Sequence, residues 1–172
     1  EPWRLPDVDA LPAFPVRFAP EGQPGVKFQP YQRDPATLAR PWAKPGTLGL
    51  QHRIGGLEKQ DGTGNISYDP ANHQHMIDTR AAKVARIADS LPPLQPLGAP
   101  TGDVLVIGWG STRGAITAAT LRLQKEGQAI SCVFLRHLNP LPNDLLALMR
   151  GFKQVVVPEL NCGQLAMLLR AR

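Results

Sequence analysis

The chain has 172 residues, of which 42% are hydrophobic and 19% are charged. This composition supports a packed core and excludes a wholly disordered chain. No apolar run reaches the roughly 20 residues that cross a bilayer, and no basic-then-apolar leader opens the sequence, so we expect no membrane span. The two cysteines, Cys132 and Cys162, are too few for a disulfide scaffold, which favours a reducing, cytoplasmic compartment.

The net charge of +5 does not indicate a nucleic-acid-binding surface. Residues 1–100 carry 11 Lys and Arg against 10 Asp and Glu, whereas residues 101–172 carry 8 against 4. The cations of the second stretch are scattered along the chain, and Trp109, Phe134 and Phe152 are its only aromatic residues. A stacking platform for bases needs more rings than this, so no nucleic acid is expected as a partner.

The sequence divides into three stretches, residues 1–50, 51–100 and 101–172. The first holds ten of the eighteen prolines, which excludes a long helix or a central strand. It also holds six of the ten aromatic residues: Trp3, Phe14, Phe18, Phe28, Tyr31 and Trp42. Because disordered linkers are poor in aromatic residues, we predict an extended arm that lies against another protein surface. A long domain linker is the alternative.

Glycine and turn-forming residues dominate positions 46–72, and a helical pattern begins at His73. Asn72 is a suitable N-cap, and Pro92 and Pro93 end the helix. One apolar stripe recurs at spacings of three and four residues: Met76 or Ile77, Ala81, Val84, Ile87 or Ala88, and Leu91. We therefore expect one amphipathic helix, followed by a proline-rich linker over residues 94–100.

Charged residues surround the pair Gly55-Gly56: Arg53, Glu58, Lys59 and Asp61. Charged groups on a glycine loop can contact a substrate or another subunit, because the backbone there can approach a ligand closely. They can equally be solvated turn residues. The sequence leaves the role of this charged glycine loop open.

Residues 101–172 alternate between strand and helix patterns. Continuous apolar runs predict strands at residues 104–107, 130–135 and 154–157. Helical patterns fill the intervals at about residues 113–126, around residues 145–149, and at residues 164–170. The order βαβαβα predicts an α/β fold with a doubly wound parallel sheet, which is incomplete here because the sequence ends with the third helix.

The helix boundaries in this stretch carry their own signals. Gly127 is the expected stop of the helix that begins near Arg113, whose apolar stripe is Ile116, Ala119 and Leu123, with Thr120. Asn143 is expected to cap the second helix. Asn161 is expected to cap the third, with Gln164 three residues later as in a capping box.

The turn from Gly108 to Gly114 follows a strand and opens a helix, so it invites comparison with a phosphate-binding loop. Its spacing is G-x-G-x-x-x-G, one residue longer than the dinucleotide fingerprint, and no acidic residue ends the second strand to hold a ribose. A nucleotide-binding regulatory module that uses Gly108–Gly114 is nevertheless kept as the alternative function.

Neither metal binding nor nucleophilic catalysis has a convincing set of residues. His73 and His75 are two positions apart and point to different faces of a helix, while His52 and His137 lack partners at ligand spacing. Cys162 lies at a helix start, where a thiol can be activated, but a small residue is also common there. No G-x-S-x-G elbow is present. We expect no catalytic, cofactor-binding or metal-binding residue in this chain.

Two segments resemble thiamine diphosphate-dependent 2-oxoacid:ferredoxin oxidoreductases, and in particular the α subunit of the 2-oxoglutarate type. The first runs His52-Arg53-Ile54-Gly55-Gly56-Leu57-Glu58-Lys59, then Gly62-x-Gly64-Asn65-Ile66-Ser67, then His75-Met76-Ile77-x-x-Arg80-x-x-Lys83. The second is similar to the transketolase carboxy-terminal-like domain of these enzymes and includes Gly108-x-Gly110-Ser111, Leu138-Asn139-Pro140-Leu141-Pro142 and Val155-Val156-Val157-Pro158-Glu159-Leu160-Asn161.

The resemblance implies oxidative decarboxylation of a 2-oxoacid with coenzyme A to an acyl-CoA and CO2, with electrons passing through iron–sulfur clusters to ferredoxin. It places thiamine diphosphate, Mg²⁺ and the [4Fe-4S] ligands on a β subunit. The family's Tyr-Pro-x-Thr-Pro and Gly-Pro-Ser-Thr-Gly segments do not occur in this sequence. Residues 51–100 then correspond to the tail of the pyrimidine-binding domain, and residues 101–172 to the domain that follows. The choice between 2-oxoglutarate, pyruvate and another 2-oxoacid stays open.

Overall fold

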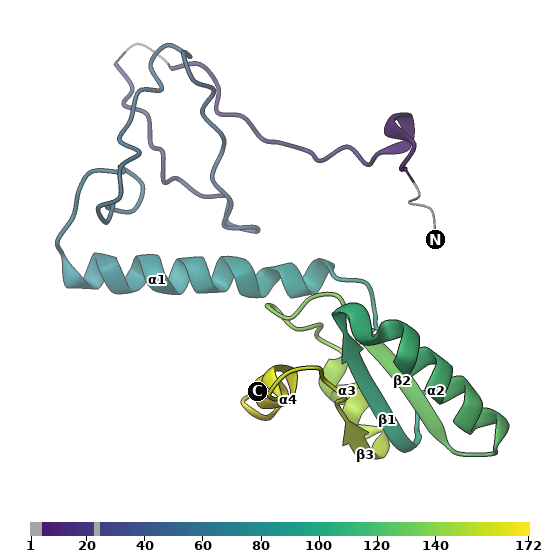
Figure 1. The fold of residues 1–172 in the computed structure, drawn as a ribbon. Coiled ribbons are helices and arrows are strands. Elements are labelled where there is room, and N and C mark those ends of the chain that lie inside the picture. The colour runs from purple at the N-terminus through teal and green to yellow at the C-terminus, as the bar shows by residue number, and fades with distance from the viewer. Residues whose placement is uncertain (1–4, 23–24) are drawn as a thin grey trace. The chain divides into compact units, whose positions relative to one another are not determined.

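The computed structural model describes residues 5–22 and 25–172, so Trp3 lies outside the described part of the chain. The chain forms two compact units, Glu1–Lys83 and Val84–Arg172 (Figure 1). Within the described residues, no helix is both long and apolar enough to cross a membrane. The three-stretch division drawn from the sequence remains a prediction.

The second unit is built on a sheet of three parallel strands: β1 (Gly102–Trp109), β2 (Ile130–Leu135) and β3 (Phe152–Val156). The strand order is β2-β1-β3, with β1 in the centre. Val106 of β1 lies opposite Cys132 of β2 and Val156 of β3. The predicted α/β fold with a parallel sheet is confirmed.

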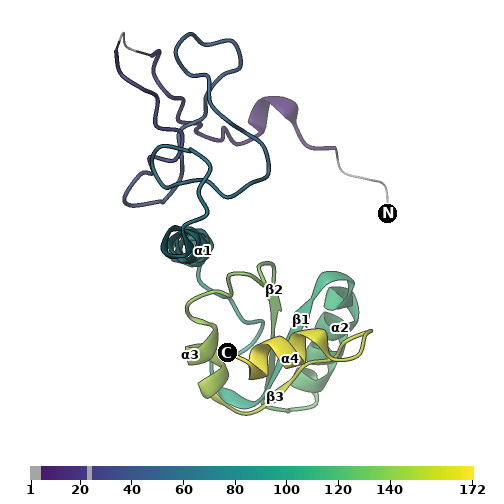
Figure 2. The same cartoon turned by 90° about the vertical axis from the view of Figure 1, so that its left-hand side faces the viewer.

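Helices cover both faces of this sheet, as a doubly wound fold requires. They are α2 (Arg113–Lys125), α3 (Leu145–Arg150) and α4 (Gln164–Arg170) (Figure 2). A short 3₁₀ turn, η3 (Gly110–Thr112), joins β1 to α2. Since β2 and β3 lie on opposite sides of β1, right-handed crossovers place α2 on one face and α3 on the other.

The main core lies between the sheet and the helices α3 and α4. Alternate residues of each strand point to this face, so β1 contributes Leu105 and Ile107. The remaining buried members of the cluster come from β2, α3, β3 and α4: Val133, Leu135, Leu145, Phe152 and Leu165. Burial of these side chains is the main source of stability in the second unit.

On the opposite face, α2 approaches the sheet closely at Gly108. A β-carbon built on this glycine would lie 2.6 Å from Ile116 Cδ1 and 2.9 Å from Phe134 Cε1. The stripe predicted for α2 is confirmed at Ile116 and Thr120, which are buried. It is wrong at Ala119, which is exposed. Ala119 fits the spacing of the predicted apolar stripe, but in the helix Thr120 faces the sheet in its place.

The side-chain cap expected at the start of α3 does not form. Asn143 does not cap α3, because its side-chain amide donates to Asp89 Oδ1 at 2.9 Å. Asp144 directly precedes the helix and accepts a hydrogen bond from the Leu94 amide at 2.7 Å. Both contacts join the start of α3 to residues that precede it by 50 and 54 positions in the chain. Local cap signals do not record contacts between residues so far apart.

At α4 the expected cap is confirmed in part. Asn161 Oδ1 accepts from the amides of Gly163 and Gln164 at 2.8 and 2.9 Å. Glu159 makes the stronger contribution, because its two carboxylate oxygens accept from the Leu165 and Ala166 amides at 2.9 and 3.1 Å. Gly163, with φ of 86°, is the residue that turns the chain into the helix.

In the first unit, α1 (Pro70–Ala85) begins three residues earlier than the sequence pattern predicted and continues into a 3₁₀ helix, η2 (Arg86–Ser90). The Asp69 side chain accepts from the Ala71 amide at 3.0 Å, and Pro70 occupies the first helical position. Asn72 is therefore inside the helix and does not cap it. Met76 is fully buried, whereas Ile77 and Ala81 of the predicted stripe are exposed.

The proline-rich arm folds back on itself without forming a sheet. Its described part contains one 3₁₀ turn, η1 (Val8–Ala10), and single bridges such as Phe18 with Trp42. Only Pro30 and Leu50 are buried among the described residues of 5–50. Large apolar side chains therefore remain exposed, with Phe14 at 83%.

The close approach at Gly108 gives a first test. Gly108→Ala should lower the free energy of unfolding of the second unit by about 1–3 kcal/mol, because the added methyl group overlaps the Phe134 ring. The matched control is Gly114→Ala in α2, where no atom lies within 4 Å of the added carbon. That change should be neutral or stabilising by up to about 1 kcal/mol. Urea denaturation measures both, and equal effects would contradict the packing argument.

The Glu159 carboxylate gives a second test. Burial raises the pKa of Glu159, but hydrogen bonds from the Leu165 and Ala166 amides, and then from Asn161 and Trp109, hold its pKa below the ordinary value. Its stabilising contribution is therefore present at neutral pH and is lost as the pH falls below about 4. Glu159→Gln should lower the melting temperature at pH 7, and the difference from wild type should shrink in acid. Glu126→Gln, which alters only an exposed pair with Arg122, is the control.

Candidate functional site

The charged glycine loop, residues 53–61, is held in one conformation by a buried lysine. Lys59 is only 3% exposed, and its ammonium group donates hydrogen bonds to the carbonyl oxygens of Gly55 and Leu57. A buried ammonium without acceptors would be costly, so the loop backbone folds around it. The sequence left the charges of this loop open between a contact role and solvated turn residues, and the burial of Lys59 was not expected from it.

Glu58 fixes one end of this loop to α1. Its carboxylate contacts His73 Nδ1 at 2.7 Å and Arg80 at 3.5 Å. The hydrogen bond from His73 is the largest influence on the Glu58 carboxyl and lowers its pKa, and Arg80 and the Lys59 amide lower it further, against burial. Glu58 is thus an anion at neutral pH, bound to the first turns of the helix.

Asp61 fixes the other end. Arg33 contacts Asp61 Oδ1 at 2.7 Å, and His75 Nε2 lies 3.3 Å from Oδ2. Asn72, the residue before His73, donates to the Lys59 carbonyl oxygen and accepts from the Asp61 amide, both at 3.0 Å. Asn72 and Arg33 were not identified from the sequence as loop partners, because both contacts join segments distant along the chain.

The histidines therefore serve as loop anchors. As expected from their spacing, His73 and His75 reach different partners, Glu58 and Asp61. Within the described residues, no group of three or more His, Cys, Asp or Glu side chains could hold a metal ion.

The tip of the charged glycine loop is open to solvent. A β-carbon on Gly55 or Gly56 would have no neighbour within 4 Å. Ile54 is 85% exposed, and Arg53 and Leu57 are exposed as well. The contacts of Lys59, Glu58 and Asp61 thus hold a loop whose tip is uncovered, which is the arrangement expected of a segment that contacts another molecule.

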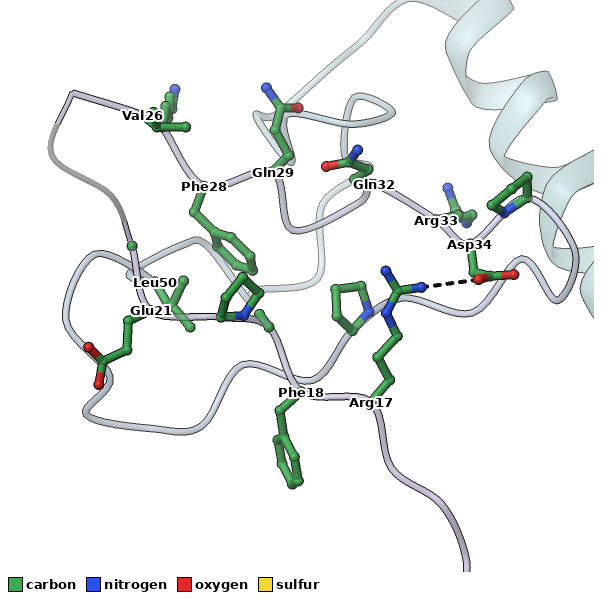
Figure 3. A pocket seen from close by; sticks show the side chains of 16 residues that line it. Arg17, Phe18, Glu21, Val26, Phe28, Gln29, Gln32, Arg33, Asp34 and Leu50 are labelled. Atoms are coloured by element: carbon green, nitrogen blue, oxygen red, sulfur yellow. Dashed lines mark hydrogen bonds and ion pairs between the residues drawn. The ribbon is translucent and has the colours of Figure 1, made fainter.

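A hollow of about 470 Å³ lies within the arm (Figure 3). Phe28 points into it and Leu50 lies at its base, while the ion pair between Arg17 and Asp34, 3.0 Å apart, borders one side. Backbone hydrogen bonds to Asp34 from Thr37 and Ala36 outweigh burial and lower the pKa of that carboxyl, with Arg17 adding to the effect. The hollow combines apolar walls with charged residues of both signs, which distinguishes no class of ligand.

A second hollow in the first unit, of about 330 Å³, has a different electrostatic character. Its lining includes three basic residues, Arg40, His52 and Lys83, and no acidic residue. The remaining lining residues are apolar: Phe28, Pro30, Pro41, Trp42, Ala43 and Ile54. We call this hollow the cationic pocket.

At the carboxyl end of the sheet, the Gly108–Gly114 turn is used for folding. Thr112 Oγ1 donates to the Trp109 carbonyl at 2.8 Å inside η3. The crevice beside β1 is where ligands bind in open α/β sheets. Here the Trp109 indole donates to Glu159 Oε1 at 3.1 Å, so a carboxylate of the chain itself occupies the donors at this point.

The cysteines and the implied cofactors find no matching set of residues. Cys132 is buried in β2 and Cys162 is exposed beside α4, and both are free thiols. An iron–sulfur cluster takes four cysteine ligands, and a magnesium-bound diphosphate takes a group of oxygen ligands. The described residues bring together neither set. We therefore assign no step of the oxidative decarboxylation that the resemblance implies to Cys132 or Cys162.

Comparison with known proteins gives a consistent relationship. No family model matches the chain. It is 50% identical, over its whole length, to the 2-oxoglutarate oxidoreductase subunit KorA of Mycobacterium tuberculosis, of which it covers 26%. It is 33% identical over 69% of its length to the α subunit of 2-oxoacid:ferredoxin oxidoreductase 2 of Aeropyrum pernix, of which it covers 19%.

A solved structure agrees with the sequence relatives. The 2-oxoglutarate:ferredoxin oxidoreductase of Magnetococcus marinus, with 2-oxoglutarate, coenzyme A and succinyl-CoA bound, superposes with a TM-score of 0.77 at 33% identity. The match covers 88% of this chain and 27% of that one. The nucleotide-binding alternative receives no support from these relatives. The chain spans about a quarter of the length of the KorA subunit, and by this homology it belongs to the family of 2-oxoacid:ferredoxin oxidoreductase α subunits.

Proposed function

We propose that the chain is part of the α subunit of a 2-oxoglutarate:ferredoxin oxidoreductase that uses thiamine diphosphate. The whole enzyme would release CO2 from 2-oxoglutarate, join the remaining acyl group to coenzyme A, and pass two electrons to ferredoxin through an iron–sulfur cluster. The observation that carries this proposal is the 50% identity to a 2-oxoglutarate oxidoreductase subunit over the entire chain.

Within that enzyme, we assign this segment to structure and subunit contact. Its ionised groups are engaged in holding loops, as Lys59, Glu58 and Asp61 are, and the described residues do not assemble a metal or cluster site. Thiamine diphosphate, Mg²⁺ and a [4Fe-4S] cluster would be bound by a β subunit. The free thiols Cys132 and Cys162 are consistent with a reducing compartment, and we place the enzyme in the cytoplasm.

The arm is the segment that we assign to docking, either on the rest of the α subunit or on the β subunit. Phe14 is 83% exposed and Phe18 is 47% exposed, although such rings are rarely left uncovered in clusters. At roughly 25 cal/mol per Å² of buried apolar surface, several such rings supply a docking free energy of a few kcal/mol. Fixed proline φ angles reduce the entropy lost when the arm is ordered.

The enzymatic proposal is tested with the complete enzyme that contains this chain. Reduction of ferredoxin should require 2-oxoglutarate and coenzyme A together, and 2-oxoglutarate should be preferred to pyruvate. The chain alone should show no turnover, no visible iron–sulfur absorption and no thiamine diphosphate binding in calorimetry. Turnover with pyruvate only would contradict the substrate, and a stoichiometric cluster on the isolated chain would contradict the assignment of cofactors to the partner.

Limited proteolysis tests the docking role of the arm. Chymotrypsin should cut after Phe18, which is 47% exposed and is followed by Ala19, at least tenfold faster in the isolated chain than in the complete enzyme, because docking covers the exposed ring. Cleavage after Phe152, which is buried in the second unit, should be slow in both preparations. Equal protection of Phe18 in the two preparations would show that the arm carries its own packing.

A further inference from the structure

The cationic pocket concentrates positive charge where composition does not require it. The sequence up to residue 100 is nearly neutral, with 11 Lys and Arg against 10 Asp and Glu. Yet all three ionisable residues that line this pocket are basic: Arg40, His52 and Lys83. Local segregation of charge, rather than an excess of basic residues, therefore produces the field inside it.

The carboxylates of the first unit that enter ion pairs bind other cations. Asp34 pairs with Arg17, Glu58 with His73 and Arg80, and Asp61 with Arg33 and His75. None of the three basic pocket residues has a carboxylate partner among the residues that the structure describes. Arg40 and Lys83 thus bring two positive charges to the pocket without a carboxylate beside them, and an anion in the pocket would be attracted to both.

Two of the three groups are held in place before any ligand arrives. The Arg40 guanidinium lies 4.2 Å from the centre of the Tyr31 ring, and its Nη1 lies 3.4 Å from the Pro30 carbonyl oxygen. His52 donates from Nδ1 to the Leu50 carbonyl at 2.7 Å, which leaves Nε2 without a partner in the described part of the chain. The imidazole also packs edge-on against Phe28, with ring centres 5.3 Å apart. Such preorganisation lowers the entropic cost of binding.

The remaining walls indicate the rest of the ligand. Trp42 is 65% exposed and Ile54 contributes apolar surface from the tip of the charged glycine loop. The volume of about 330 Å³ equals that of about eleven waters at about 30 Å³ each, which is enough room for one end of a ligand. Arginine, lysine and imidazole together suit a phosphate, and exposed aromatic surface suits a flat ring beside it.

We propose that the cationic pocket binds the phosphate-bearing, aromatic end of a small ligand, with Arg40, His52 and Lys83 around the phosphate and Trp42 against the ring. If the proposed function holds, coenzyme A is the substrate of that enzyme with this chemistry. The identity of the ligand rests on the proposed function, whereas the affinity for a phosphorylated ring does not.

The experiment uses the complete enzyme and measures dissociation constants by calorimetry for coenzyme A and for adenosine 3′,5′-bisphosphate, the nucleotide end alone. Lys83→Met and Arg40→Met should each weaken both ligands at least tenfold, and wild-type binding should weaken as salt is added. Lys125→Met, an exposed lysine in the last turn of α2, removes the same charge elsewhere and should leave both constants unchanged. Arg40→Lys, which keeps the charge, should retain most of the affinity.

Several results would overturn the proposal. One is that both ligands bind Lys83→Met and Arg40→Met as tightly as wild type. Another is that the variants raise the KM for 2-oxoglutarate while nucleotide binding is unchanged, since the pocket would then hold a carboxylate. Dissociation of the variant subunits in gel filtration would assign the pocket to an acidic segment of the partner. If wild-type enzyme binds the bisphosphate through these residues but does not turn over 2-oxoglutarate, the proposed function fails and the pocket stands.

Discussion

The second unit depends on the central position of strand β1. Both other strands hydrogen-bond to it, and its alternate side chains enter the packing on both faces of the sheet. Leu105 and Ile107 meet α3 and α4, while Gly108 leaves space for α2 to approach. Because the crossovers on either side of this strand are right-handed, its position also decides which face each helix covers.

The first unit is stabilised in a different way. Few of its side chains are buried, and polar contacts over long sequence separations replace a large core. Lys59 shapes the charged glycine loop through two backbone carbonyls, and α1 holds that loop through His73 and His75. A unit of this kind exposes more apolar surface than an independent domain does, which is consistent with burial of that surface against other protein.

Many polar groups of this segment are bound to other residues of the chain, which explains why we assign it a structural rather than a catalytic role. At the crevice of the sheet, where open α/β folds usually bind a ligand, the Glu159 carboxylate occupies the amides of α4 and the Trp109 indole. In the loop, the acidic residues are engaged by histidine and arginine. Arg40 and Lys83, which have no carboxylate partner among the described residues, instead line the cationic pocket, formed by segments far apart in sequence.

The sequence by itself determined the parallel α/β order, the strand at Ile130–Leu135 and the stop at Gly127, because each follows from local pattern or backbone freedom. Motif resemblance also determined the family. The burial of Lys59, the Asn143 contact with Asp89 and the cap by Glu159 were decided only by tertiary structure. Asn143 and Asp89 are 54 residues apart, so no local signal records their contact. At α4, Glu159 accepts from the Leu165 and Ala166 amides beside the two amides that Asn161 caps, and the burial of Lys59 depends on how the chain packs, so a local cap or turn signal records neither.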